Sequence, residues 1–197
     1  MAMDPETFNQ LLDAIRRFVT ERLMPLEHQV ANDDAVPDEV KREMAEMGLF
    51  GLTIPEEYGG IGVTMEEEAQ ICMELGRTSP AFRSVFGTSI GIGSQGILMD
   101  GTDEQKQKYL PKIAVGECVA SFALTEPDAG SDAAHLKTTA IRDGDEYVFN
   151  GTKRFITNAP SADIMTVMAR TNPDIDGAGG VSSFIVERGT PGLSFGK

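Results

Sequence analysis

Two segments in the second half of the chain combine residue types that could bind a polar ligand. The first, residues 122–132, reads FALTEPDAGSD and begins with small and apolar residues that are typical of a strand. It breaks at Pro127 into a loop whose glycine, hydroxyl groups and backbone N–H groups suit a polar ligand. The second, residues 151–158, reads GTKRFITN and follows two turn signals. The first segment taken alone could also be only a strand followed by a polar turn, because Pro, Asp and Gly favour turns.

The two segments together, in this order and spacing, resemble the flavin-binding signatures of the acyl-CoA dehydrogenases. Two segments in the first half resemble further landmarks of that family: residues 52–62, LTIPEEYGGIG, and residues 101–111, GTDEQKQKYLP. The resemblance therefore covers essentially the whole chain.

The resemblance implies an FAD site, and the residue types fit that cofactor. A flavin needs an aromatic wall, hydroxyl donors at its ring edge and backbone amides for its carbonyls and pyrophosphate. We expect Phe155 to form the wall, where the family usually has tryptophan, and the Thr157 hydroxyl to reach flavin N5. Phe122 and Leu124 are expected to hold the pyrimidine edge through their backbone. The other cofactor-binding residues that we expect are Thr125, Gly130, Ser131 and Ile156.

The implied substrate is an acyl-CoA, with Ser131 near the thioester arm as well as the pyrophosphate. A helix predicted over residues 81–99 should line the acyl pocket, with Thr88 and Ile92 on the lining face. Arg83 resembles the residue with which glutaryl-CoA dehydrogenases hold a distal carboxylate, although Gly87 lacks the hydroxyl that those enzymes add one turn later. The alternative is that Arg83 pairs with a nearby acidic residue of the protein.

The implied reaction is α,β-desaturation of the thioester, with hydride transfer to flavin N5. In the family the base that removes the α-proton is a glutamate of a C-terminal helical domain, so we expect no catalytic residue in this chain. The chain resembles an N-terminal half and is expected to bind FAD weakly and to be inactive alone. The resemblance also implies an electron-transferring flavoprotein as electron acceptor and a homodimer or homotetramer at full length. Alternatives are an acyl-CoA oxidase or related flavin monooxygenase of the same fold, and a non-catalytic fragment.

The predicted fold class is α+β, with an all-α domain at residues 1–116 followed by a truncated, antiparallel, β-barrel-like domain at residues 117–197. Apolar residues recur at helical spacing in the first half, and Thr64 and Thr102 each begin a capping box. One helix is expected to stop before Pro111. The second half changes to strand periodicity, with strands predicted at residues 118–125, 137–141, 147–149, 154–157, 164–169 and 183–186.

Residues 91–96, GIGSQG, match the dinucleotide-binding pattern G-x-G-x-x-G. That pattern requires a preceding strand and a long following helix, but Asp100-Gly101 interrupts the sequence a few residues later. We therefore assign these glycines to close helix packing or ligand approach.

The composition excludes several other classes of function. Asp and Glu total 31 against 17 Lys and Arg, a formal net charge of -14 that disfavours nucleic acid and anionic membranes as partners. Any site for the anionic CoA must therefore be a local basic patch or lie on sequence outside this chain. The two cysteines and two histidines lack metal-site or redox spacing, so no metal is expected. Without a signal-like or membrane-spanning segment, a cytoplasmic location with reduced thiols is expected.

Overall fold

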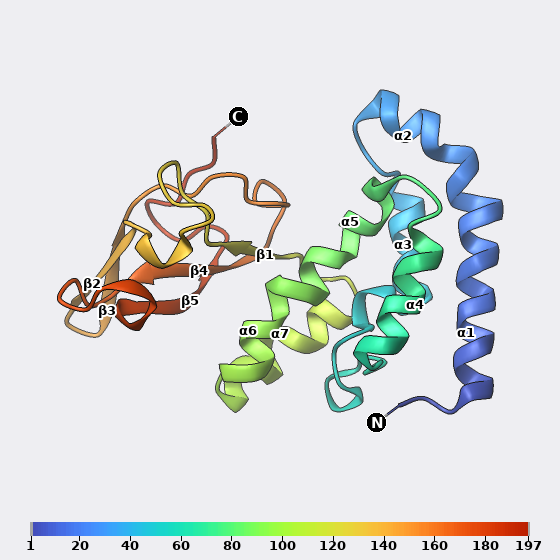
Figure 1. Cartoon of the computed structure of the whole chain (residues 1–197), viewed down its shortest axis with the longest axis horizontal. Coiled ribbons are helices and arrows are strands. Elements are labelled where there is room, and N and C mark those ends of the chain that lie inside the picture. Colours follow the sequence, from blue (N-terminus) through green and yellow to red (C-terminus); the bar gives the residue numbers. More distant parts are fainter. Residues whose placement is uncertain (1, 197) are drawn as a thin grey trace.

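Helices occupy the chain up to Ala114, and strands follow from Ala120 (Figure 1). The structure is a computed structural model that describes residues 2–196. The α-helices are α1 Pro5–Phe18, α2 Glu27–Asp33, α3 Asp38–Glu46, α4 Met65–Leu75, α5 Pro80–Thr88, α6 Ser94–Asp100 and α7 Asp103–Ala114. The strands are β1 Ala120–Ala123, β2 Thr139–Asp143, β3 Glu146–Asn150, β4 Ile164–Arg170 and β5 Val181–Glu187. The predicted α+β class, helical region first, is confirmed.

Local side-chain hydrogen bonds fix where the helices begin. Thr64 and Thr102 each form the predicted capping box, with Glu67 and Gln105 as the reciprocal partners. The predicted stop before Pro111 is wrong, because α7 runs on to Ala114. Its last turns bury Leu110 and Ile113 completely, and this burial outweighs the one backbone hydrogen bond that proline removes.

The helix predicted over residues 81–99 is divided into two. Gly91 has a non-helical backbone (φ -86°, ψ -116°), and the segment Ser89–Gly93 between α5 and α6 is wound as a π-helix. No strand precedes Gly91 in this part of the chain, so the dinucleotide-binding interpretation is excluded. Gly93 packs against the sheet region, because a Cβ there would lie 3.1 Å from the carbonyl carbon of Ala120. This confirms close packing as the role of that glycine.

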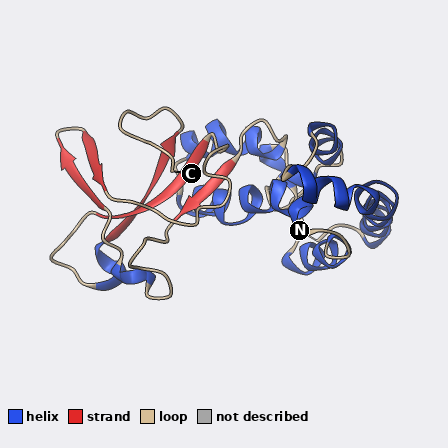
Figure 2. Cartoon of the chain, turned by 90° about the horizontal axis from the view of Figure 1, so that it is seen from above, coloured by secondary structure: helices blue, strands red, loops and turns tan. Residues whose placement is uncertain are grey.

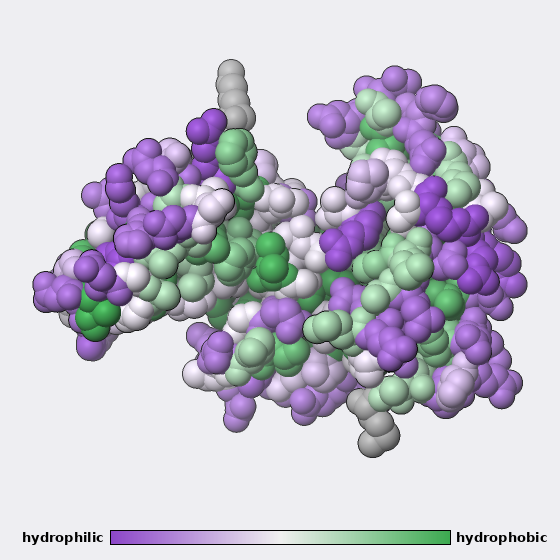
Figure 3. All heavy atoms as spheres, in the orientation of Figure 1, coloured by the Kyte–Doolittle hydropathy of each residue, from purple (hydrophilic) through white to green (hydrophobic). Residues whose placement is uncertain are grey.

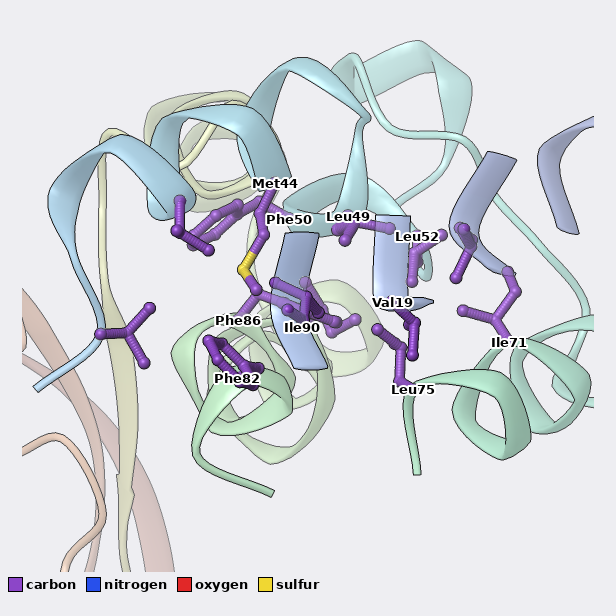
Figure 4. Close-up of a cluster of buried hydrophobic side chains, with 14 of the residues drawn as sticks. Val19, Met44, Leu49, Phe50, Leu52, Ile71, Leu75, Phe82, Phe86 and Ile90 are labelled. Carbon is purple, nitrogen blue, oxygen red and sulfur yellow. The ribbon is translucent and has the colours of Figure 1, made fainter. Parts of the chain in front are cut away.

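The core of the helical region brings together side chains from α1, α3, α4 and α5, from the segments that follow α1 and α5, and from the short turn that follows Gly48. Figure 4 shows ten of them labelled at the centre of this region. All are at most 5% exposed: Val19, Met44, Leu49, Phe50, Leu52, Ile71, Leu75, Phe82, Phe86 and Ile90. This core anchors α5 in the helical region, and α5 also contacts β1 of the sheet region.

The sheet is mixed and open, with strand order β1-β4-β2-β3 and β5 on the other side of β4 (Figure 2). β4 pairs antiparallel with β5 but parallel with β1, so the pairing is less uniformly antiparallel than predicted. The predicted strand at residues 154–157 is wrong. Phe155 has a left-handed backbone (φ 58°), outside the β region, and residues 154–157 pair with no strand. The segment is instead a loop beside β1.

The helical and sheet regions are joined by hydrogen bonds and by a shared apolar cluster. The Ser89 hydroxyl contacts both backbone groups of Ala120, and Glu187 of β5 accepts from Lys108 Nζ and Tyr109 Oη at 2.8 and 2.7 Å. The cluster combines Ile97, Leu110 and Ile113 with Ala120 and Ile164.

Among residues 2–196, no helix combines the length and apolarity that crossing a bilayer requires. In the same part of the chain, His, Cys, Asp and Glu side chains form no metal-like cluster.

Candidate flavin and substrate site

The two sequence segments singled out above lie side by side. Arg154 N donates to Thr125 O at 2.8 Å, and the Ser121 hydroxyl donates to Thr157 O at 2.5 Å. These contacts hold the loop at residues 153–158 along β1 and its continuation. Thr125 and Thr157 therefore belong to neighbouring stretches of chain, although Thr125 lies two residues beyond the end of β1 and Thr157 lies in a loop.

A buried ion pair connects the same two stretches. Lys153 Nζ lies 2.8 Å from Glu126 Oε1 and 3.0 Å from Leu124 O. The Glu126 carboxylate also accepts from the backbone N–H groups of Lys137 and Thr138 at 2.6 and 2.9 Å. Sequence reasoning missed both charged residues. The available signal was that each stands inside one of the two conspicuous segments.

The electrostatics of this pair favour the ionised carboxylate. Burial by itself would raise the pKa of Glu126, but the hydrogen bonds from Lys153, Thr138 and Lys137 outweigh it and lower the pKa to about 2. Burial lowers the pKa of Lys153, while the adjacent carboxylate opposes that shift. Glu126 is therefore a fixed negative charge at neutral pH rather than a candidate base.

Phe155 is the most unusual aromatic residue in the two segments. Its side chain is 80% exposed, and its backbone lies in the left-handed region that bulky residues rarely adopt. The Arg154 guanidinium stands 4.5 Å from its ring centroid, on one side of the ring. A strained, exposed ring adds nothing to the core, and such strain is concentrated at functional sites. The neighbouring Ile156 is half-buried against the sheet.

The polar loop after Glu126 is fixed at its start by backbone hydrogen bonds, and its backbone is accessible at Gly130. Backbone hydrogen bonds between Glu126 and Ala129 close its first turn. A Cβ at Gly130 would meet no atom within 4 Å, and Ser131 is exposed beside it. At the far end of the loop, His135 Nδ1 lies 2.7 Å from Asp132 Oδ1. The loop therefore offers an open backbone surface to a ligand.

The expected substrate residues of α5 and its continuation differ in exposure. Thr88 is half-buried, and Ile92 is 58% exposed. The Arg83 guanidinium lies over Gly87 and reaches the Cys72 sulfur at 4.0 Å. Among the ion pairs within residues 2–196, Arg83 has no carboxylate partner. The alternative of a structural acid partner for Arg83 is therefore not what the structure shows.

A cleft of about 430 Å³ lies between the helical region and the sheet region, where Figure 3 shows the surface hollowed. Its walls come from α3, from α5, and from the chain at residues 115–119 and 158–161. Ser84 and Val85 of α5 line it, next to the loop that carries Asn158. The cleft therefore adjoins the end of the loop that bears Phe155 and Thr157.

The buried Cys118 adds no reactive thiolate to this region. Burial, with a smaller contribution from the charge of Asp163, raises the pKa of the Cys118 thiol to about 11. Cys72 and Cys118 are both free thiols, as expected.

Comparison with known proteins accounts for both halves of the chain. Residues 5–117 match the family description of the acyl-CoA dehydrogenase N-terminal domain, and residues 121–197 match that of the middle domain. The acyl-CoA dehydrogenase of Bacillus subtilis (strain 168) is 40% identical over 183 residues, which cover 93% of this chain and 48% of that protein.

Two solved structures superpose closely on the chain. One is described as the electron transferring flavoprotein of Acidaminococcus fermentans, with a TM-score of 0.90 and 37% identity over 99% of this chain and 52% of the matched chain. The other, PigA with FAD and proline, has a TM-score of 0.90 and 31% identity over the same shares. The chain thus spans about half the length of the relatives that it matches. With matches to two consecutive domains, a shared fold and relatives at this identity, the chain belongs to the acyl-CoA dehydrogenase family.

Proposed function

We propose that this chain is the N-terminal half of an FAD-dependent acyl-CoA dehydrogenase and contributes residues that contact the flavin ring. The observation that carries the proposal is the loop at residues 153–158. It lies along the end of β1 and presents a strained, exposed Phe155 between a buried cation and a hydroxyl-bearing residue. A flat ring with polar edges fits that combination of groups.

The residues present fit the chemistry of the cofactor. Thr125 offers a hydroxyl and Phe122 and Leu124 offer backbone groups for the pyrimidine edge, while Phe155 offers a flat apolar surface for one face of the ring. Thr157 offers a hydroxyl within the same loop, and Gly130 and Ser131 offer an open backbone surface for the pyrophosphate. FAD, when bound, supplies the hydride acceptor of the reaction. Its presence in PigA, a relative of the same fold, supports FAD as the cofactor.

The substrate that we propose is an acyl-CoA thioester, which is oxidised to the 2,3-enoyl-CoA. Ser131 lies in the loop that would follow the thioester arm, and Thr88 and Ile92 would line the acyl chain from the helical side. The α-proton of a thioester is too weak an acid for any side chain unless the carbonyl is polarised. We assign the base to a glutamate of the second half of the protein, so no catalytic residue is assigned here.

We propose that Arg83 binds a distal carboxylate on the acyl chain of the substrate. The structure leaves its guanidinium without an acidic partner among the described residues and rests it over Gly87. An arginine in this state can swing toward an anionic ligand without breaking an ion pair. An electron-transferring flavoprotein is the proposed electron acceptor and a homo-oligomer the proposed assembly. The likeness to the Acidaminococcus fermentans structure supports the former.

The proposal is tested by anaerobic titration of the full-length protein with saturated acyl-CoAs of increasing chain length and with glutaryl-CoA. We expect a yellow protein whose flavin absorbance is bleached by at least one of them. A colourless protein that takes up no FAD, or a flavin that no acyl-CoA reduces, would contradict the proposed function. In the same assay, Arg83→Ala should lower reduction by a dicarboxylyl thioester more than tenfold and spare simple acyl-CoAs.

A further inference from the structure

Lys153 is hydrogen-bonded to the residues on both sides of Thr125. Its ammonium donates to Leu124 O at 3.0 Å and to Glu126 Oε1 at 2.8 Å, while the next residue, Arg154, donates its N–H to Thr125 O at 2.8 Å. Three consecutive residues of the first segment are thus held by two consecutive residues of the second. No other lysine within residues 2–196 is bonded in this way to both neighbours of a proposed ligand-binding residue.

Glu126 extends the same connection to the start of β2. Its carboxylate accepts the backbone N–H groups of Lys137 and Thr138, and its own backbone closes the turn to Ala129. Gly151 packs against the same place, because a Cβ there would lie 2.7 Å from the Thr138 Cα. Three stretches of chain that are distant in sequence therefore meet at one carboxylate.

The pair is buried on both sides, with side-chain exposures of 11% for Lys153 and 4% for Glu126. A buried ion pair is a poor source of stability, because removing both charges from water offsets most of their attraction. A neutral amide at position 126 with an apolar residue at position 153 would remove both charges and still offer an acceptor to the backbone N–H groups of Lys137 and Thr138. Such a pair could not direct a donor at Leu124 O, and this is the contribution that Lys153 makes.

We infer that the Glu126–Lys153 pair is a positioning device, which fixes Thr125 against the loop at residues 155–157 and so sets the spacing between the two sides of the flavin site. This inference rests on the proposed function for the identity of the ligand. It adds two residues that make no contact with the reacting atoms themselves. Their effect passes through Thr125 and through the backbone of the loop that carries Phe155.

Stability and positioning are separated by a double variant. Lys153→Met alone strands the Glu126 charge and should lower both stability and FAD affinity. Glu126→Gln combined with Lys153→Met removes both charges, so stability should return close to that of the parent protein. The hold on Leu124 O is still missing in the double variant, so its FAD affinity should stay at least tenfold lower. Fluorescence titration of the full-length apoprotein with FAD, beside urea unfolding, measures both.

Lys108→Met with Glu187→Gln is the control for the loss of an ion pair as such, at a pair that is half exposed. It removes a lysine–carboxylate pair of the same 2.8 Å length at the junction of the helical and sheet regions, away from Thr125. This control should leave FAD affinity within twofold of the parent. Recovery of FAD affinity together with stability in the Glu126/Lys153 double variant would show that the pair is only structural, and would overturn the inference.

A second readout does not depend on flavin binding. In the isolated chain, the Arg154 amide should exchange with deuterium at least tenfold faster in the double variant than in the parent, relative to amides of β4. An unchanged exchange rate at Arg154 would contradict the positioning role. If the full-length parent protein binds no FAD, the proposed function fails, whereas the exchange measurement still decides whether the pair fixes this segment.

Discussion

Glu126 is the carboxyl group whose environment in this chain differs most from water. It lies in a conspicuous sequence segment, yet nothing in the sequence distinguishes it from Asp128 or Asp132, which are both exposed. Glu126 differs from these two residues in its burial and its hydrogen-bond partners. Those partners, Lys153, Lys137 and Thr138, are distant from it in the sequence. The residue types of the candidate site could therefore be predicted from the sequence, but the charged pair behind it could not.

The depressed pKa of Glu126 predicts a specific dependence of stability on pH. Because its pKa falls from 4.5 to about 2 on folding, the unfolded chain takes up the proton more readily. Its contribution to the free energy of unfolding is therefore fully present above the unfolded-state pKa and is lost as pH falls through the interval between the two values. Urea unfolding across that interval should show the parent losing more stability than Glu126→Gln. A constant difference between the two proteins would contradict the assignment.

At the scale of elements, local sequence patterns predicted the features that depend on contacts between residues close in sequence. The capping boxes at Thr64 and Thr102 are made within one turn of helix, so their pattern was sufficient. The loop at residues 154–157 was misassigned as a strand, because Phe, Ile and Thr favour strands locally. Its contacts to Ser121 and Thr125 hold it in a left-handed conformation at Phe155 instead. Contacts between residues that are distant in sequence do not alter the local pattern of apolar and polar residues, so that pattern could not predict them.

Two glycines should respond oppositely to the same substitution. The three atoms nearest to a Cβ at Gly87 on α5 would all belong to the guanidinium of Arg83, the movable end of a flexible side chain. Gly87→Ala should therefore raise the free energy of unfolding by about 0.5–1 kcal/mol through helix propensity. A Cβ at Gly151 would lie 2.7 Å from the Thr138 Cα, which cannot move away. Gly151→Ala should cost about 1–3 kcal/mol, and urea midpoints measure both changes. Equal effects at the two sites would refute this contrast.

At the scale of the whole molecule, the helical and sheet regions share an apolar cluster and a charged hydrogen bond, so they are expected to unfold together. The cluster takes Leu110 and Ile113 from α7 and Ile164 from β4. Tyr109 of α7 donates its hydroxyl to Glu187 of β5 at 2.7 Å. The change from helical to strand periodicity in the sequence predicted the position at which helices are followed by strands. The contacts that join the two regions were not visible in the sequence, because their residues are distant along the chain.

Tyr109→Phe tests that junction. The change removes one hydrogen bond to a half-exposed carboxylate and keeps the buried ring, so it should cost about 1 kcal/mol. Circular dichroism at helix and strand wavelengths should still show one coincident thermal transition. Two separate transitions in the parent chain would show that the regions do not stabilise each other.

The central claim is that the loop bearing Phe155 forms one face of a flavin site, and FAD affinity measures it most directly. Phe195 offers a matched control, since it is also exposed, at 39%, and also has an arginine guanidinium over its ring, at 5.5 Å from the centroid. In the full-length protein, Phe155→Ala should raise the Kd for FAD at least tenfold, the equivalent of about 1.4 kcal/mol, while Phe195→Ala leaves it within twofold. An unchanged Kd in Phe155→Ala, or an equal loss in both variants, would contradict the account.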